Sequence, residues 1–212
     1  LIGAYVGDAL TDADFNVAVG KVALGADTLG SKSTAIGHGT LNVQNFTTAT
    51  DAANTAIGYH AGVRVTTGNN NTFLGSESGQ NITTGTGNVF LGYQAGDALN
   101  TSHDCVAVGV TALGADTKGG RSVAVGASTL AAQNQTTSTS THNTAIGHGA
   151  GNAVTTGIQN TFVGGLSGLV ATDADNNTAV GYNSLVANTL GHRNTAVGVG
   201  SLFATNPASA VN

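Results

Sequence analysis

The sequence contains no tryptophan and no methionine, one proline and one cysteine, and only 8% of its 212 residues are charged. The single cysteine, Cys105, excludes a disulfide framework. No apolar run approaches the ~20 residues that cross a bilayer, which predicts a soluble chain without membrane insertion. Six lysine and arginine residues and a formal charge of −5 leave no basic stripe for a phosphate backbone, so nucleic acid is not an expected partner.

Glycine is abundant instead, with 32 residues, and it marks a repeat. Twelve glycines, which we call anchors, each close a short phrase; the steps between them are 17 residues, or 21 in two places: Gly3, Gly20, Gly37, Gly58, Gly75, Gly92, Gly109, Gly126, Gly147, Gly164, Gly181 and Gly198. The two long steps begin 89 residues apart, and LIGAYVGDAL at 1–10 aligns with FLGYQAGDAL at 90–99. A block of five repeats has therefore been duplicated in tandem.

Each repeat follows one pattern before its anchor. The residue four positions before is Asn in eight of the eleven complete repeats, and β-branched or aliphatic residues follow at alternate positions, as in VAV at 106–108. Such a segment predicts a short strand, and glycine-containing stretches such as 66–68 predict turns. Seventeen residues cannot form a core alone, so the coils must stack. We predict an all-β, parallel β-solenoid of about twelve coils, a single domain over 1–212, with a ladder of stacked Asn side chains.

The two faces of each strand differ. The residues three and one before the anchor are Thr, Val, Ile or Leu and share one face, whereas the residue between them, Ala or Phe, points the other way. We predict that the β-branched face fills the coil and that the Ala/Phe face packs against other copies of the chain. The expected interface residues are Phe73, Phe90, Phe162, Ala56, Ala107 and Ala145. Alternation alone leaves the reverse arrangement open.

The phrase NTAIGYHAG at 54–62, with variants at 88–96 and 177–185, resembles the repeats of phage tail-fibre and other "tail fiber domain" proteins. It is more distantly similar to the heads of YadA-like trimeric autotransporter adhesins. The resemblance implies a left-handed β-roll, a parallel homotrimer and a place outside the cell, on the cell surface or on a virion. We therefore expect a fragment of a longer fibre protein, a stiff structural rod that displays loops for attachment to a host or surface.

The two longer steps each contain a polar stretch with four extra residues. The stretches include Gln44, Asn45, Phe46 and Thr47 in the first block, and Gln133, Asn134, Gln135 and Thr136 in the second. Insertions in solenoids leave the rod as loops, often on the binding side. We predict that they are surface loops, and either contact host glycans or proteins or are merely tolerated surface bulges.

Two pairs of carboxylates are the candidates for a metal site, since Asp12 and Asp14, and Asp173 and Asp175, lie on one side of an extended segment. A hard cation such as Ca²⁺ could bind there, but neither pair has the dense acidic loop that calcium needs. We therefore interpret both as solvated turns, and we expect no cofactor.

Catalytic chemistry has little support in the sequence. Glu77 is the only glutamate, and no Asp lies beside it at the spacing of a glycosidase pair, so we do not expect an enzyme; a glycan depolymerase stays the third alternative. His38 and His148 directly follow anchors and are interpreted as exposed polar residues. The second alternative is an ice-binding or other ordered-surface binder that uses a row of Thr such as Thr55 and Thr72, which requires that this row faces outwards.

Overall fold

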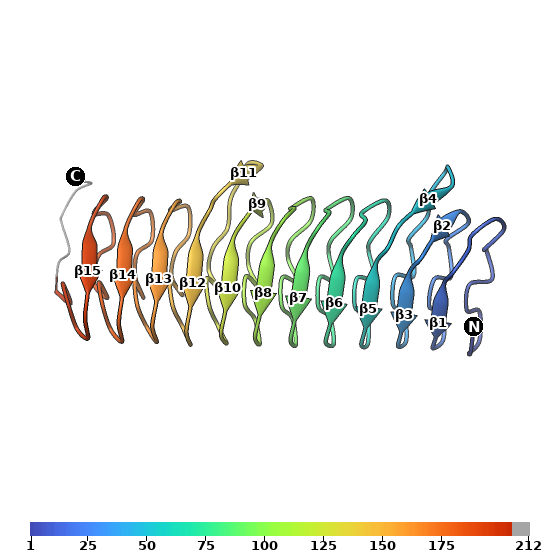
Figure 1. The fold of residues 1–212 in the computed structure, drawn as a ribbon, viewed down its shortest axis with the longest axis horizontal. Coiled ribbons are helices and arrows are strands. Elements are labelled where there is room, and N and C mark those ends of the chain that lie inside the picture. Colours follow the sequence, from blue (N-terminus) through green and yellow to red (C-terminus); the bar gives the residue numbers. More distant parts are fainter. Residues whose placement is uncertain (205–212) are drawn as a thin grey trace.

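Eleven short parallel strands lie side by side along a rod, one from each coil (Figure 1). The computed structural model describes residues 1–204 of the chain. The strands are β1 (Val17–Val19), β3 (Thr34–Ile36), β5 (Thr55–Ile57), β6 (Thr72–Leu74), β7 (Val89–Leu91), β8 (Val106–Val108), β10 (Val123–Val125), β12 (Thr144–Ile146), β13 (Thr161–Val163), β14 (Thr178–Val180) and β15 (Thr195–Val197).

Every strand pairs with the next coil in the register of the repeat, so that Thr55 lies opposite Thr72 and Ile57 opposite Leu74. The first phrase contributes only an isolated bridge between Ile2 and Val19. At ~4.8 Å per strand the sheet is roughly 50 Å long. The predicted all-β, parallel β-solenoid is confirmed, with about eleven turns; the trimer and the left-handed coiling stay predictions.

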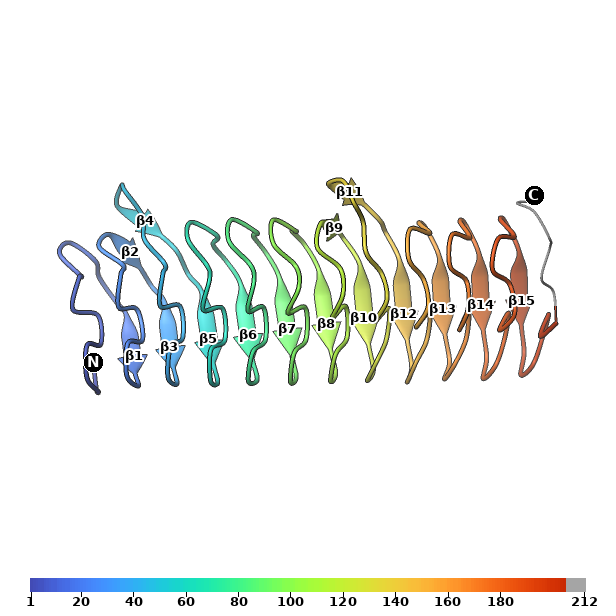
Figure 2. The same ribbon diagram turned by 180° about the vertical axis from the view of Figure 1, so that it is seen from behind.

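Two small sheets protrude from one edge of the rod, at the two 21-residue steps (Figures 1 and 2). In the first, β2 (Gly30–Ser31) pairs with β4 (Thr50–Asp51), and in the second, β9 (Gly119–Gly120) pairs with β11 (Thr139–Ser140). The expectation that both insertions leave the rod as loops on the same side is therefore confirmed.

The predicted Asn ladder runs inside the rod. Asn71 donates from its backbone N–H and from Nδ2 to Oδ1 of Asn54, at 2.9 and 3.1 Å, and its Nδ2 also reaches the Gly85 carbonyl oxygen at 2.9 Å. Asn160 repeats the arrangement on Asn143. Each amide thus satisfies the backbone of its own coil and ties it to the preceding coil.

Cys105 interrupts this ladder as expected. Its sulfur has only weak contacts with two backbone carbonyl oxygens, at 3.6 Å each. The side chain is fully buried, and this burial raises the pKa of the thiol to about 11. Cys105 is therefore a protonated, packed side chain rather than a reactive one.

The anchor glycines are required by the close approach of neighbouring coils. Gly58 has φ +137°, and a Cβ at this position would lie 2.4 Å from the carbonyl oxygen of Gly75. The same conflict between successive anchors recurs along the rod. Any larger residue would push two coils apart, which explains why the glycine recurs with the period of the strand.

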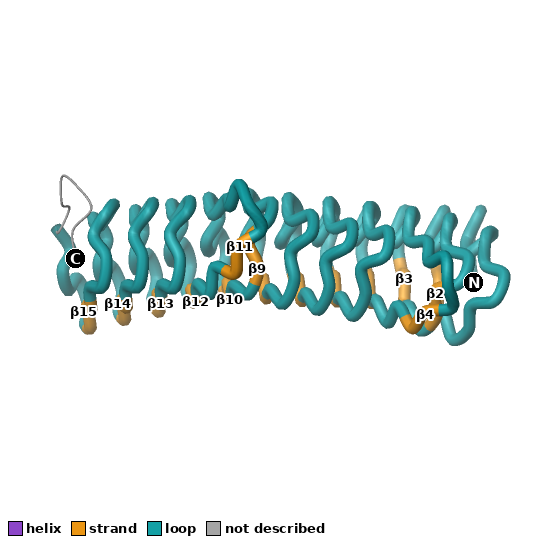
Figure 3. Tube along the Cα trace, turned by 90° about the horizontal axis from the view of Figure 1, so that it is seen from above, coloured by secondary structure: helices purple, strands orange, loops and turns teal. Residues whose placement is uncertain are grey.

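The prediction about the two strand faces is wrong. The six residues expected at the interface are fully buried inside a single chain: Phe73, Phe90, Phe162, Ala56, Ala107 and Ala145. The Thr, Val, Ile and Leu on either side of them point out of the coil, along the one side of the rod that carries the strands (Figure 3). These six residues therefore cannot form an interface between copies, and the argument that derived self-association from them fails.

Alanine dominates the buried row because the coil is thin. In most coils a buried Ala is followed six residues later by a Leu that fills the interior; the buried examples are Leu24, Leu41, Leu113, Leu130 and Leu185, whereas Leu202 in the last described coil is 41% exposed. Where the strand carries Phe, the Leu is replaced by Gly: a Cβ at Gly79 would lie 2.6 Å from Phe73, and one at Gly168 would lie 2.5 Å from Phe162. Phe with Gly and Ala with Leu are thus alternative ways to fill the same volume.

This exchange of volume can be tested with a double-mutant cycle on Phe162 and Gly168. Phe162→Ala should lower the free energy of unfolding by ~3–5 kcal/mol, because it leaves a cavity. Gly168→Leu should also destabilise, because Leu collides with the ring. The double variant should cost clearly less than the sum, since it recreates the Ala–Leu pair of other coils. Strictly additive costs in denaturant unfolding would refute the compensation.

Candidate functional site

The outer face of the sheet is an apolar strip with two rows of side chains. One row, Thr or Val, begins each strand, and the other, Val, Ile or Leu, ends it. Leu74 and Leu91 are 42% and 41% exposed. Other exposed apolar members of the two rows are Val17, Val89, Ile146, Val180 and Val197, and Thr72 and Thr195 are exposed as well. Because the strands pair in register, each row runs straight along the rod, and the described chain presents it to solvent.

The first protruding loop, which we call flap 1 (residues 45–51), is held by a buried polar cluster. The Gln44 amide donates from Nε2 to Oδ2 of Asp27 at 2.6 Å and to Oγ of Ser33 at 3.2 Å. Its Oε1 accepts a hydrogen bond from Nδ2 of Asn54 at 2.8 Å. Ser33 stands where other coils have the ladder Asn, so Gln44 completes the ladder where Asn is missing.

Flap 2 (residues 134–140) repeats this anchorage 89 residues later. Nε2 of Gln133 donates to Oδ2 of Asp116 at 2.5 Å and to Oγ of Ser122 at 3.3 Å, and Oε1 accepts from Nδ2 of Asn143 at 2.8 Å. Asp116 also accepts backbone N–H groups from Gly119 and from the flap itself. The cluster of Asp, Gln, Ser and Asn side chains therefore accompanies each insertion and holds it to the rod by hydrogen bonds.

This burial corrects part of the loop prediction. Gln44 and Gln133 are fully buried, and Phe46 and Gln135 are only 5% and 6% exposed, so these four residues cannot form a binding surface. The exposed members are Asn45 and Thr47 in flap 1, and Asn134 and Thr136 in flap 2. The insertions consist mainly of polar residues, so the sequence did not show which of their side chains point into the rod.

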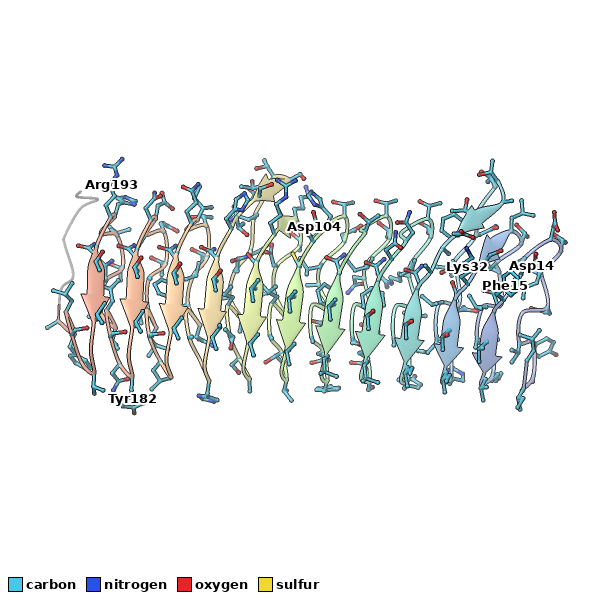
Figure 4. The ribbon with its side chains drawn as sticks, viewed as in Figure 1. Asp14, Phe15, Lys32, Asp104, Tyr182 and Arg193 are labelled. Atoms are coloured by element: carbon cyan, nitrogen blue, oxygen red, sulfur yellow. The ribbon has the colours of Figure 1, made fainter. Side chains whose placement is uncertain are left out.

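Charged side chains surround the bases of both flaps (Figure 4). Lys32 pairs with Asp51, the last residue of flap 1, with Nζ and Oδ2 2.5 Å apart. At flap 2, Arg121 lies 3.8 Å from Asp104 and donates to Ser140 at 3.1 Å. These pairs are exposed and of low energetic weight. They fasten the flap bases and concentrate no charge of one sign.

One of the two pairs of candidate metal ligands forms hydrogen bonds between stacked coils. Oδ1 of Asp173 accepts hydrogen bonds from Thr155 and Thr156 at 2.8 and 2.6 Å, and Oδ1 of Asp175 accepts the N–H of Ile158 at 2.8 Å. Asp12 and Asp14 are exposed. Within residues 1–204 no three His, Cys, Asp or Glu side chains are placed to hold a metal ion, so these pairs do not fit a Ca²⁺ site.

A ring cluster lies on the anchor edge, the rod edge formed by the residues that follow the anchor glycines. The rings of His38 and Tyr59 are stacked with centroids 5.5 Å apart, and those of Tyr59 and His60 are stacked at 3.9 Å. His38 and Tyr59 are exposed. Figure 4 places Tyr182, which holds the corresponding position after Gly181, on the edge opposite the flaps. The sequence predicted His38 and His148 as exposed polar residues at a position where other coils have Tyr, such as Tyr59, but it did not predict the cluster.

Glu77 lies beside this cluster in the next coil, where its backbone N–H donates to the Tyr59 carbonyl oxygen at 2.8 Å, and Asp97 lies one coil further on. Burial raises the pKa of the Asp97 carboxyl above its ordinary value of 3.8, and the nearby charge of Glu77 adds to the rise. Glu77 also accepts a hydrogen bond at 2.8 Å from Nε2 of Gln94. Nothing in the sequence pairs Glu77 with Asp97, because the two residues are twenty positions apart and only the stacking places them in adjacent coils.

Comparisons with protein-family models, with curated proteins and with solved structures found no match to this chain. The described residues contain no helix, and hence none that could cross a membrane. The functional argument therefore rests on the outer face, the flaps and the anchor edge.

Loss of the buried Gln133 amide, which holds flap 2 to the rod, should destabilise the chain. Gln133→Ala leaves the buried Asp116 carboxylate and the Asn143 amide short of partners, so we expect a loss of ~1–3 kcal/mol in the free energy of unfolding. Amide exchange in flap 2 should accelerate. Ser138→Ala, at the exposed flap tip, is the matched control and should change stability by less than ~0.5 kcal/mol. Equal unfolding midpoints for the two variants would contradict the stabilising role of Gln133.

Two carboxylates should affect the pH dependence of stability in opposite directions. The pKa of Asp97 is raised in the folded state, so its ionised form costs stability above that pKa, and Asp97→Asn should raise the melting temperature at pH 7 but not below pH ~3. Hydrogen bonds from the hydroxyls of Thr156 and Thr155 lower the pKa of Asp173. Asp173→Asn should therefore lower the melting temperature at pH 7, and this loss should fade towards pH ~3. Melting curves of the same sign for both variants would contradict the assignment.

Proposed function

We propose that this chain is a stiff structural segment of an extracellular or virion fibre, and that it associates with further copies of itself through its outer face. The observation that carries the proposal is the apolar strip on the sheet. Strands of parallel sheets are normally covered on both faces, and exposed apolar patches mark sites of association. The interior of the coil covers one face of this sheet, and a partner is needed for the other.

A second copy of the chain suits this face better than an unrelated partner. The two rows repeat once per coil, so a parallel copy brings every coil against an equivalent coil, and one favourable contact is repeated along the rod. The number of copies, three, and the location outside the cell follow from the resemblance to tail-fibre and adhesin repeats. The flaps protrude from an edge of the sheet, where a fibre can display their exposed Asn and Thr side chains to a host surface.

The mass of the isolated chain tests this proposal. Sedimentation equilibrium of residues 1–212 should give three times the chain mass. Leu74→Lys with Leu91→Lys should yield folded monomers, because two charges would be buried in the interface. The matched control, Thr67→Lys with Thr84→Lys, adds the same charge at exposed turns of neighbouring coils and should leave the assembly intact. A monomeric wild-type chain, or a trimer that survives the Leu substitutions, would overturn the proposal.

Ice binding is the second candidate, because the structure places the threonine row outside. Thr55, Thr72 and Thr161 belong to a straight row at the spacing of the strands, which is the arrangement that the alternative required. The adjacent row argues against it, since Val, Ile and Leu differ in length and make the surface uneven. Thermal hysteresis of a monomeric chain would favour this candidate, whereas its absence together with a trimeric mass would favour the fibre.

A further inference from the structure

We propose that the anchor edge binds a neutral glycan over the coils of Gly37 to Gly92, with His38, Tyr59 and His60 as a stacking platform and Glu77 and Asp97 as hydrogen-bond acceptors. We call these five residues the ring–acid patch. The proposal goes beyond the fibre function and does not depend on the trimer, because the patch lies on turns after the strands and not on the outer face.

The platform has the form that sugar recognition requires. His38 contacts both other rings, at 5.5 Å from Tyr59 and 5.3 Å from His60, so the three side chains support one another. His60 also packs over Gly39, where a Cβ would lie 2.6 Å from its ring. Tyr59 nevertheless remains 50% exposed. A ring that is held in place and half exposed can pack against the C–H groups of a pyranose at small cost in side-chain entropy.

The acids supply the polar half of the site. Carboxylate oxygens accept hydrogen bonds from pairs of neighbouring sugar hydroxyls, and a few such fixed acceptors orient a ligand on an apolar surface. Gln94 holds the Glu77 carboxylate by the hydrogen bond at 2.8 Å, and Asp97 is close enough to sense its charge. The five patch residues include two carboxylates and no Lys or Arg, and Lys21 lies beside His38 in the preceding coil. The two carboxylates favour a neutral glycan over one that carries sulfate, phosphate or carboxylate groups.

The duplicated block shows that the fold does not need this patch. At the positions 89 residues later the chain has Ala127, His148, Gly149, Leu166 and Val186, whereas Asp97 itself has a counterpart 89 residues earlier, Asp8. The strands of that block pair in the same register and have the same buried rows. Because the same coils form without the ring–acid patch, its residues are not explained by stacking or by core packing.

Tyr93 extends the platform along the rod. It occupies the position of Tyr59 two coils further on, at a spacing of ~10 Å, and is 49% exposed. Ser76, the residue at this position in the coil between them, has a short side chain. A glycan that runs parallel to the rod can place one sugar on Tyr59 and a later sugar on Tyr93. The ligand is therefore an oligosaccharide rather than a monosaccharide.

Binding can be measured on the intact chain with neutral hexasaccharides as probes. Cellohexaose, chitohexaose and maltohexaose should be titrated against the wild-type chain and followed by tyrosine fluorescence and by saturation-transfer NMR; the chain has four Tyr and no Trp. We expect at least one probe to bind, with a Kd below ~1 mM, and its sulfated analogue to bind at least tenfold more weakly.

The decisive variant replaces patch residues by those found 89 residues later: His38→Ala, His60→Gly, Glu77→Leu and Asp97→Val. It should lose binding at least tenfold while retaining its sedimentation mass. The matched control, His148→Ala with Tyr182→Ala on the second block, should bind as the wild type does. Should the fourfold variant fail to fold, Tyr59→Ala, at an exposed side chain, should show the same loss.

Three outcomes would overturn the proposal. The first is that none of the probes binds; the second is that the patch variant binds as the wild type does; the third is that the control loses binding equally. A patch variant with a reduced sedimentation mass would assign these residues to self-association and would also overturn it. A monomeric wild type that binds a probe would refute the proposed trimer and leave the glycan site standing.

Discussion

Register between stacked coils is the constraint on which the rest of the structure depends. Each strand pairs with the corresponding strand of the next coil, and buried Asn side chains such as Asn71 bond to the preceding coil at the same point. The coils approach so closely at the anchors that only glycine fits there. Because a shift by one residue would break all three arrangements together, the period of 17 residues is maintained along the chain.

The same constraint explains how the rod accepts irregular features. An insertion must leave the coil without disturbing its neighbours, and each flap does so at a coil that lacks the ladder Asn, where Gln44 or Gln133 restores the missing amide. Phe162 enters a thin interior because Gly151 and Gly168 make room for it. Surface chemistry is free to vary where no stacking contact is involved, as the ring–acid patch and its altered copy in the second block illustrate.

Much of the candidate surface could not be predicted from the sequence. The positions of both flaps followed from the two long steps. The burial of Gln44 and Phe46 could not be predicted, since they lie in a polar segment that is typical of exposed loops. The proximity of Asp97 to Glu77 arises between adjacent coils and depends on where each turn places its side chain. His38 and Tyr59 are close for the same reason.

The sequence by itself determined the repeat, the strands, the parallel stack and the Asn ladder, because all of these follow from residues that recur at one period. Only the tertiary structure decided which face of the strand is inside. Alternation assigns residues to two sets but does not orient them, and both sets here are apolar. The interior volume decided: a coil of 17 residues is too narrow for a continuous row of Val, Ile and Leu, but it accepts Ala with Leu or Phe with Gly, so the β-branched rows lie outside.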